Sequence, residues 1–409
     1  MKKYLFFLLS GLFILFGCTH SKKNSSQWRG PDRQGIYYET DLLKIWSDSG
    51  PELLWSYEGL GSGHSSVGIG NNCIFVNGMP DTLGILYSFD FDGKLLWKKV
   101  YGTEWHENYT GTRSTPLVVD DVVYLESGMG VVYCINAFSG EIIWQVDLLN
   151  KFNANNIKWG MAESLLIDGD KLICTPGGKE FNIVALNRFN GETIWTSSGF
   201  EEQSAYCSPV LVAHNNTRLI VTMTATSVIA VDADTGEFYW REVQMQGNLI
   251  HANTPVYSDG VIFCSSSSAK ENGGLLALKL SDDGKNVQKL WRNEDFKNLM
   301  GGFIVKDGFI YGGKYRKKEW YSVNVKSGED NLISDTLNAG VIIFADNLFY
   351  CYSDKGQIAL VDADPARFDI KSLFEVPLGT DQHWSHPVIY LGRMYIRHGN
   401  ALMVYNISE

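Results

Sequence analysis

Short alternating runs of apolar residues, separated by polar turns, follow one another along nearly the whole chain. After the apolar run Val228-Ile-Ala-Val, for example, the chain continues into a turn that contains Asp, Thr and Gly, and then into a second run that carries a tryptophan. Asp and Gly tolerate the backbone conformations of a hairpin turn. Alternation at every second position is typical of half-buried β-strands. The pattern therefore predicts β-hairpins in series and an all-β fold.

The hairpins share a glycine four residues before a tryptophan. Four copies have this spacing, in the pairs Gly93 and Trp97, Gly140 and Trp144, Gly191 and Trp195, and Gly236 and Trp240. Three weaker copies follow: one ends at Trp291, one has Leu332 in place of the tryptophan, and one has Pro365 in place of the glycine. The same supersecondary unit is therefore repeated along the chain.

The spacing of the tryptophans matches the length of a propeller blade. Consecutive members of the series Trp55, Trp97, Trp144, Trp195, Trp240 and Trp291 are 42 to 51 residues apart, which is enough for four strands. From Pro51 to the C-terminus the chain holds eight such lengths. The second of them is expected to contain strands at 114–119, 122–127, 132–136 and 142–146.

The two ends of the chain supply complementary parts of one blade. The last length holds only three predicted strands, at 385–391, 394–398 and 401–407, whereas the strand at 52–57 has no blade of its own. Pairing these strands would close the ring and remove free strand edges. We therefore predict a single eight-bladed β-propeller of four-stranded antiparallel blades over residues 28–409.

The Gly-x-x-x-Trp element behind an Asp or Asn turn resembles the tryptophan-docking repeat of the quinoprotein-like propellers, which carry pyrroloquinoline-quinone-type repeats. The segment from Val231 to Trp240 is the nearest match. The opening Gln27-Trp28-Arg29-Gly30-Pro31 and the stretch from Cys174 to Gly178 resemble an exported bacterial lipoprotein subgroup of this family. We interpret the repeated tryptophans as wedges between blades and not as the floor of a cofactor site.

The N-terminus has the order of charges and apolar residues of a secretory signal. Lys2 and Lys3 precede an apolar run that ends at Phe16, and Gly17 and Cys18 follow. The cysteine resembles the lipidated residue of a bacterial lipobox, although an ordinary signal peptide with an incidental cysteine is the alternative. We expect residues 1–17 to be a lipoprotein signal peptide and residues 18–27 a tether. The resemblance implies export, with membrane lipid on Cys18 holding the protein at the outer membrane, facing the periplasm.

Charge and cysteine usage restrict the partners. The net charge of −11 becomes still more negative when residues 1–17 are removed, so a nucleic-acid partner is not expected.

Six cysteines remain after Cys18, most of them within apolar strands and none in a C-x-x-C pair. We therefore expect buried free thiols rather than disulfides.

The entry of each blade gathers the residues that could form a site. The first strand of a blade should lie nearest the axis, and Ser/Thr-Pro pairs mark its start. In this register the innermost ring consists of Ser66, Thr115, Ser164, Ser208, Thr254, Gly302, Gly340 and His386. Together with His386, the chemically richer residues one to three positions upstream form our candidate funnel, which consists of His64, Arg113, Glu163, Tyr206, His251, Asn253, His383, Trp384 and His386.

Three interpretations of this ring remain open. It is a solvated polar rim, or a pocket for a small molecule or glycan with Trp384 and Tyr206 as stacking surfaces, or a metal site that uses His64, His251, His383 or His386 with Glu163. The metal interpretation is the weakest, because His383 and His386 are out of phase on an extended strand. We predict no metal.

Two classes of function follow. The first is a non-catalytic binding or scaffold module with a protein or small-molecule partner, which resembles the lipoprotein propeller that assists outer-membrane barrel assembly. The second is an enzyme with its site at the channel mouth, either a quinone-dependent dehydrogenase or a carbohydrate-active enzyme. The resemblance implies that quinone enzymes have adjacent cysteines beneath the cofactor, and this chain has none. We therefore favour the first class and expect no cofactor.

Overall fold

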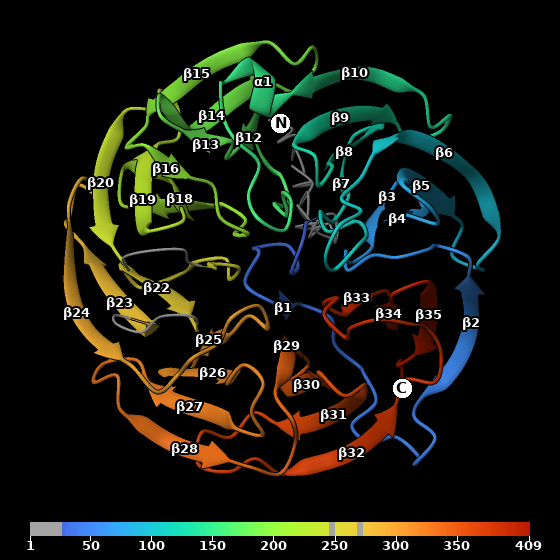
Figure 1. The fold of residues 1–409 in the computed structure, drawn as a ribbon. Helices are drawn as coiled ribbons and strands as arrows, with labels where there is room; N and C mark the ends of the chain where they lie inside the picture. Colours follow the sequence, from blue (N-terminus) through green and yellow to red (C-terminus); the bar gives the residue numbers. More distant parts are fainter. Residues whose placement is uncertain (1–26, 245–249, 268–272) are drawn as a thin grey trace, which may run out of the picture.

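Each predicted hairpin forms the outer half of a four-stranded antiparallel sheet, and the described residues contain eight such sheets around one axis (Figure 1). The computed structural model describes residues 27–244, 250–267 and 273–409. The predicted signal peptide, Cys18 and the tether up to residue 26 lie outside the described residues. The eight-bladed propeller predicted from the sequence is confirmed.

The blades share one order, from the axis outward. The innermost strands are β3 (Gly68–Gly70), β7 (Leu117–Val119), β11 (Leu166–Asp168), β17 (Val210–His214), β21 (Val256–Ser258), β25 (Ile304–Lys306), β29 (Gly340–Ala345) and β33 (Val388–Tyr390). The second strands are β4 (Cys73–Gly78), β8 (Val122–Glu126), β12 (Lys171–Cys174), β18 (Thr217–Met223), β22 (Val261–Ser266), β26 (Phe309–Gly313), β30 (Leu348–Ser353) and β34 (Arg393–His398). We number the blades I to VIII in this order.

In blades I to VII the outer half is the hairpin seen in the sequence, whereas in blade VIII it consists of two strands from opposite ends of the chain. The third strands are β5 (Leu83–Phe89), β9 (Val131–Asn136), β14 (Phe181–Asn187), β19 (Ser227–Asp232), β23 (Gly274–Leu280), β27 (Trp320–Asn324), β31 (Gln357–Asp362) and β35 (Ala401–Asn406). The outermost strands are β6 (Leu95–Thr103), β10 (Ile142–Asp147), β15 (Thr193–Ser198), β20 (Phe238–Val243), β24 (Val287–Asn293), β28 (Asp330–Ser334), β32 (Ile370–Glu375) and β2 (Glu52–Glu58). The short elements β13 (Gly177–Gly178), β16 (Glu202–Gln203) and α1 (Leu148–Lys151) lie in connections between these strands.

Strand β2 closes the ring, as predicted from the sequence. Strand β2 pairs antiparallel with β35 in blade VIII, with Glu52 opposite Asn406 and Ser56 opposite Met403. A strand near the N-terminus thus completes the blade formed by the C-terminus. The chain ends are held together by a strand ladder, and this sheet has no missing outer strand.

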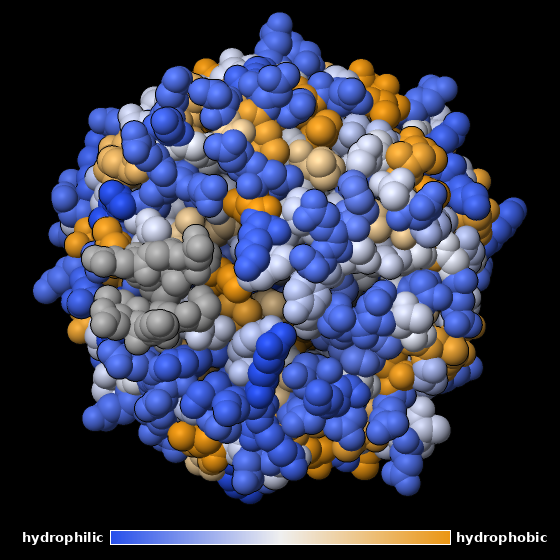
Figure 2. All heavy atoms as spheres, in the orientation of Figure 1, coloured by the Kyte–Doolittle hydropathy of each residue, from blue (hydrophilic) through white to orange (hydrophobic). Residues whose placement is uncertain are grey.

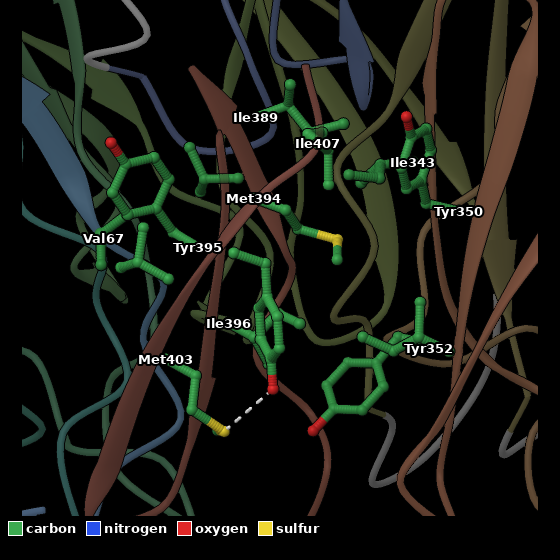
Figure 3. Close-up of a cluster of buried hydrophobic side chains, with 14 of the residues drawn as sticks. Val67, Ile343, Tyr350, Tyr352, Ile389, Met394, Tyr395, Ile396, Met403 and Ile407 are labelled. Atoms are coloured by element: carbon green, nitrogen blue, oxygen red, sulfur yellow. Dashed lines mark hydrogen bonds between the residues drawn. The ribbon is translucent and has the colours of Figure 1, made fainter. Parts of the chain in front are cut away.

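The closing seam has a continuous hydrophobic core. Figure 3 shows Ile343 and Tyr350 of blade VII, Met394 and Ile396 of blade VIII, and Val67 next to blade I packed in one cluster. All five side chains are buried. Burial of this apolar surface stabilises the contact of blade VIII with both of its neighbours.

The repeated tryptophans lie between blades. The indole of Trp97 in blade I covers Gly140 of blade II, and its Nε1 donates a hydrogen bond to the carbonyl oxygen of Ala137 at 3.2 Å. Five of the six predicted tryptophans donate in this way to a carbonyl of the next blade, namely Trp55, Trp97, Trp144, Trp240 and Trp291. A buried indole paired in this way packs the blades together without an unsatisfied donor.

The glycine of the repeat is required by both space and backbone conformation. Gly236 has a φ of 74°, and a Cβ atom placed on it would lie 2.5 Å from the Trp195 ring. Gly308 has a similar φ of 82°, but a Cβ atom placed there would meet nothing within 4 Å. The two glycines therefore form a matched pair that differs in packing only.

We expect Gly236→Ala to lower the free energy of unfolding by about 1–3 kcal/mol more than Gly308→Ala, because both substitutions strain the backbone but only the first overpacks a core contact. Urea unfolding of both variants measures the difference. Equal destabilisation by Gly236→Ala and Gly308→Ala would show that Trp195 does not pack against the turn of the next blade in solution.

The segment that precedes the first blade runs through the middle of the ring. Strand β1 (Ile36–Tyr37) pairs in parallel with the innermost strand β29, and Figure 1 shows it near the axis. Arg29 donates from Nη2 to the carbonyl oxygen of Phe303 at 2.9 Å, and Arg33 donates from Nη1 to that of Leu165 at 2.9 Å. Both arginines are buried, which lowers their pKa to about 10 and leaves them charged at neutral pH. We call residues 28–37 the plug, because they fill the channel.

Small hydroxyl residues link the innermost positions of neighbouring blades. The backbone N–H of Ser66 donates to Thr115 Oγ1 at 3.0 Å, that of Thr115 to Ser164 Oγ at 3.1 Å, and that of Ser164 to Ser208 Oγ at 2.9 Å. Ser66 Oγ in turn donates to the carbonyl oxygen of His386 at 2.7 Å. The Ser/Thr positions aligned in the sequence therefore form a chain of hydrogen bonds from blade VIII to blade IV.

The cysteines within the described residues form no disulfide. The six cysteines after Cys18 are free thiols, and five of them are buried while Cys73 is half-buried.

Among the described residues there is no helix with the length and apolar character needed to cross a bilayer.

Candidate functional site

A cavity of about 460 Å³ lies at the end of the plugged channel. The chain enters the innermost strands on this face, and hydrophobic residues are visible near the middle of the face in Figure 2. The cavity is lined by Trp28, His64, Tyr109, Arg113, Trp159, Ala162, Ser164, Tyr206, Ser208, Ile250, Ala252, Ser267, Leu299, Met300, Tyr315, Arg316, Trp384 and His386. Its volume lies in the range of small-molecule sites.

Five of the nine residues predicted for the funnel line this cavity. They are His64, Arg113, Tyr206, Trp384 and His386, and they come from blades I, II, IV and VIII. The fold therefore brings together side chains that are up to 322 residues apart in the sequence. The register of the innermost strands is the reason, because equivalent positions in each blade face the same mouth.

Three of the other predicted residues, Glu163, His251 and Asn253, are buried and do not line the cavity. Glu163 accepts a hydrogen bond from the backbone N–H of Thr175 at 2.9 Å. The Nδ1 atom of His251 lies 2.7 Å from the carbonyl oxygen of Thr224. Asn253 donates to Asn298 Oδ1 at 2.9 Å. These contacts hold the connections in place.

The fourth residue, His383, belongs to a separate stack. Its Nδ1 atom lies 2.6 Å from the hydroxyl of Tyr352, and its ring lies parallel to that of His398 with centroids 3.7 Å apart. His383 therefore lies outside the cavity, as Glu163, His251 and Asn253 do.

Strand alternation explains which residues reach the cavity. Counted back from the innermost Ser164, the residue two positions upstream, Ala162, lines the cavity, whereas Glu163 between them does not. The same holds for Tyr206 two positions before Ser208. Successive side chains of an extended chain point to opposite sides. The prediction grouped positions one to three upstream and so included residues that face away.

Several lining residues were not predicted. Trp28 comes from the plug, Tyr109 and Trp159 come from the longer connections before β7 and β11, and Tyr315 and Arg316 lie between β26 and β27. In an antiparallel blade the connection from the second to the third strand lies on the same face as the entry of the first strand. Aromatic residues in those connections were the signal that could have identified Tyr315.

Aromatic rings form the walls of the cavity. The Trp384 ring lies 4.9 Å from that of His64 and 5.4 Å from that of Tyr109, measured between centroids. Across blades III and IV, the rings of Trp159 and Tyr206 lie 5.7 Å apart, and the hydroxyl of Tyr206 accepts from the backbone N–H of Trp159 at 3.2 Å. These contacts fix the orientation of the rings.

The floor of the cavity is formed by the plug. The Trp28 ring meets the His386 ring edge-on at 5.1 Å, and His386 Nε2 lies 3.1 Å from the carbonyl oxygen of Met300. Residues from the two ends of the chain therefore meet at the base of the site.

The titratable groups of the cavity are held in fixed charge states. Burial lowers the pKa of His64 to about 3, and the positive charges of Arg113 and Arg397 favour the same direction. Burial also lowers the pKa of His386 to about 3, with a further contribution from Arg29. The pKa of Arg113 is lowered by burial to about 10. At neutral pH both imidazoles are therefore uncharged and Arg113 carries its charge.

The groups that line the cavity restrict the chemistry that it can support. Among the described residues that line the cavity, none is Asp, Glu, Lys or Cys. An imidazole with a pKa near 3 is a weak proton acceptor at neutral pH. Within the parts of the chain that the structure describes, no three His, Cys, Asp or Glu side chains come together as possible metal ligands.

The residues present do not match a pyrroloquinoline quinone site of the kind that the family resemblance implies. No two cysteines are adjacent in the sequence. The acidic and amide residues of the predicted funnel, Glu163 and Asn253, do not line the cavity and are engaged with Thr175 and Asn298. We therefore assign this protein no reaction that uses pyrroloquinoline quinone.

Comparison with known proteins identifies the family. The model of the family described as outer membrane protein assembly factor BamB matches residues 82–334. This chain belongs to that family. The outer membrane protein assembly factor BamB of Yersinia pestis is 25% identical over 347 residues, which cover 76% of this chain and 75% of that protein. The quinoprotein alcohol dehydrogenase PedH of Pseudomonas putida is 23% identical over 252 residues, which cover 59% of this chain but only 38% of that enzyme.

Solved structures show the same fold. The crystal structure of BamB from Moraxella catarrhalis superimposes with a TM-score of 0.64 at 14% identity and covers 87% of this chain and 100% of that one. Quinohemoprotein alcohol dehydrogenase from Comamonas testosteroni gives a TM-score of 0.65 at 12% identity, covering 94% and 80%. BamB and an alcohol dehydrogenase therefore share this propeller, so the fold alone does not assign an activity.

Proposed function

We propose that this protein is a non-catalytic scaffold for the assembly of outer membrane proteins, held by a lipid on Cys18 at the periplasmic face of the outer membrane. The match of the family model across residues 82–334 carries this proposal. The similarity to the Yersinia pestis protein extends it over three quarters of both chains. The charged, apolar and small-residue order that ends at Cys18 supports the lipid anchor.

The chemistry of the cavity supports a role in binding rather than catalysis. Its described lining offers two neutral imidazoles and no carboxyl group, so it has no acid–base pair. We further propose that no cofactor is used. If pyrroloquinoline quinone and calcium are added to the purified protein, we expect no reduction of an acceptor dye, and steady dye reduction with an alcohol would contradict this part of the proposal.

Blades II and III expose apolar side chains that a protein partner could contact. Their outermost strands β10 and β15 expose Ile143 and Ile194 to 51% and 45%, and the turns before these strands expose Phe138 and Phe189 to 60% and 57%. The outer edge of each strand has no paired neighbour. A partner strand could add to such an edge, with these side chains giving specificity.

Recovery of partners from membranes tests the proposal. We expect the lipid-anchored protein to retain a membrane protein complex, and the Cys18→Ala protein to retain less of it because it is not held at the membrane. The double variant Ile143→Lys and Ile194→Lys should lower the recovery at least tenfold, whereas Ile333→Lys is the control because Ile333 on β28 is also 51% exposed. If nothing is retained above the Cys18→Ala background, the scaffold function is wrong. An equal loss of recovery for the double variant and for Ile333→Lys would show that the partner does not dock on blades II and III.

A further inference from the structure

The cavity presents flat aromatic faces from separate blades. Trp384 of blade VIII lies on one wall, the pair Trp159 and Tyr206 of blades III and IV lies on another, and Trp28 forms the floor. Each ring is oriented by a neighbouring ring or a hydrogen bond. A space of about 460 Å³ bounded by oriented rings is suited to a flat ligand that stacks on them.

The charge of the lining is positive although the protein is acidic. Arg113 and Arg316 line the cavity, and none of its described lining residues is acidic, whereas the whole chain has a net charge of −11. Arg113 is anchored by donating to the carbonyl oxygens of Gly111 and Tyr109. Arg316 is exposed, with its guanidinium 5.0 Å from the centroid of the Tyr315 ring. An anionic group in the cavity would meet two fixed positive charges.

One polar side chain of the lining, His64, has no hydrogen-bond partner among the described residues. Both ring nitrogens of His64 are buried and make no hydrogen bond. His64 is neutral, so it presents one donor and one acceptor. A buried polar group left unsatisfied destabilises the free protein, and a ligand acceptor next to His64 would relieve this.

The lining is poorly suited to neutral sugars. The hydroxyls of Ser164 and Ser208 already accept hydrogen bonds from backbone N–H groups of neighbouring blades. Much of the remaining surface is contributed by Ile250, Leu299 and Met300. A sugar ring would lose hydrogen bonds to water and regain few of them here.

We propose that the central cavity is a binding site for a small organic anion that carries a flat, largely apolar ring system. The rings of Trp384, Trp159 and Trp28 stack on the ligand, Arg113 and Arg316 neutralise its charge, and His64 donates a hydrogen bond to it. This site is independent of the proposed scaffold function, since it uses the face at the axis and not the outer strands.

A pair of matched fluorescent probes tests the proposal on the full-length protein. The probes are 8-anilinonaphthalene-1-sulfonate and N-phenyl-1-naphthylamine, which have the same aromatic skeleton and differ by the sulfonate group. We expect the sulfonate to bind at least tenfold more tightly at low salt, in a ratio of one probe per chain, and 0.5 M salt to reduce the difference.

Variants assign the binding to the cavity. Arg316→Ala should weaken sulfonate binding about five- to tenfold and leave binding of the neutral probe within twofold, and Trp384→Ala should weaken both probes. Arg367→Ala is the control, because this arginine is 66% exposed on the rim of blade VII. Arg113→Lys should retain the preference for the anion, because it keeps the charge. Equal affinity for the two probes, or sulfonate binding that is unchanged in Arg316→Ala and Trp384→Ala, would overturn the proposal.

Discussion

Replacement of Arg397 by alanine is expected to lower the free energy of unfolding by about 3 kcal/mol or more. This arginine lies on β34 and is 2% exposed. Its Nη1 donates to the carbonyl oxygen of Asn77 at 2.6 Å and to Thr112 Oγ1 at 3.2 Å, and its Nε donates to the carbonyl oxygen of Gly399 at 3.0 Å. One side chain thus links blade VIII to blade I and to the entry of blade II. Alanine would leave several buried acceptors unpaired and a void at the closing seam.

Urea unfolding measures this loss, with Arg367→Ala as the control. Arg367 pairs with Asp364 on the surface and is 66% exposed, so its loss should have little effect on the free energy of unfolding. Arg397→Lys should fall between the two, because lysine keeps the charge but cannot serve all the acceptors. If Arg397→Ala is no more destabilising than the control, Arg397 does not link blade VIII to blades I and II in solution.

Replacement of Glu126 by glutamine is expected to make the protein more stable in mild alkali. Both carboxyl oxygens of Glu126 are buried without a hydrogen-bond partner. Burial raises the pKa of Glu126 well above its usual value, and the nearby Glu163 and Glu104 raise it further. Burial also raises the pKa of Glu163, to about 8. Burial and the neighbouring carboxyl groups of Glu163 and Glu104 therefore favour the protonated form of Glu126.

The sign of the pH dependence follows from proton binding. As pH rises above the usual pKa of a glutamate, the unfolded chain releases the proton of Glu126, whereas the folded chain, in which this pKa is raised, retains it to higher pH. The free energy of unfolding therefore falls as pH rises, by at most about 1.4 kcal/mol per pH unit. We expect Glu126→Gln to have a higher free energy of unfolding than the unchanged protein at pH 8, and this difference to be smaller at pH 5.

Urea unfolding at both pH values provides the measurement, and Glu141→Gln on an exposed strand end is the matched control. The same difference at pH 5 and pH 8, or an effect equal to that of the control, would show that Glu126 is ionised in the folded protein.

The sequence was sufficient for the architecture because its determinants are local and repeated. The turn glycines and the tryptophans recur at a blade length, and each pair specifies one hairpin and one contact with the next blade. The pairing of β2 with β35 followed from counting strands, since Trp55 lies on a strand without a blade and the last blade has three strands. The aligned Ser66, Thr115 and Ser164 likewise gave the innermost ring.

The candidate site was predicted less well because side-chain direction decides it. In blade V the chain from Ile250 to Asn253 alternates: Ile250 and Ala252 line the cavity, whereas His251 and Asn253 are buried and do not line it. Choosing residues by chemistry selected the histidine and the asparagine. The period of two in an extended chain would have selected the apolar residues instead.

The plug was beyond sequence reasoning for another reason. Arg29 and Arg33 bind carbonyl groups 274 and 132 residues away, and no local pattern encodes a contact between a short arginine-rich segment and the middle of a ring. The motif around Trp28 was interpreted only as a family resemblance. The structure shows that this motif closes the channel and gives the cavity its floor.

The most direct test of the account is a cross-link across the closing strands, because the cavity exists only if the ring is closed by β2. Glu52 and Asn406 are 354 residues apart in the sequence but lie opposite each other in blade VIII. In a Cys18→Ala protein we expect Glu52→Cys and Asn406→Cys to form one intramolecular disulfide, detected by peptide mass, and to raise the free energy of unfolding by about 4 kcal/mol. A protein that gives only links between chains, or no link, under the same oxidation would contradict the closed eight-bladed ring.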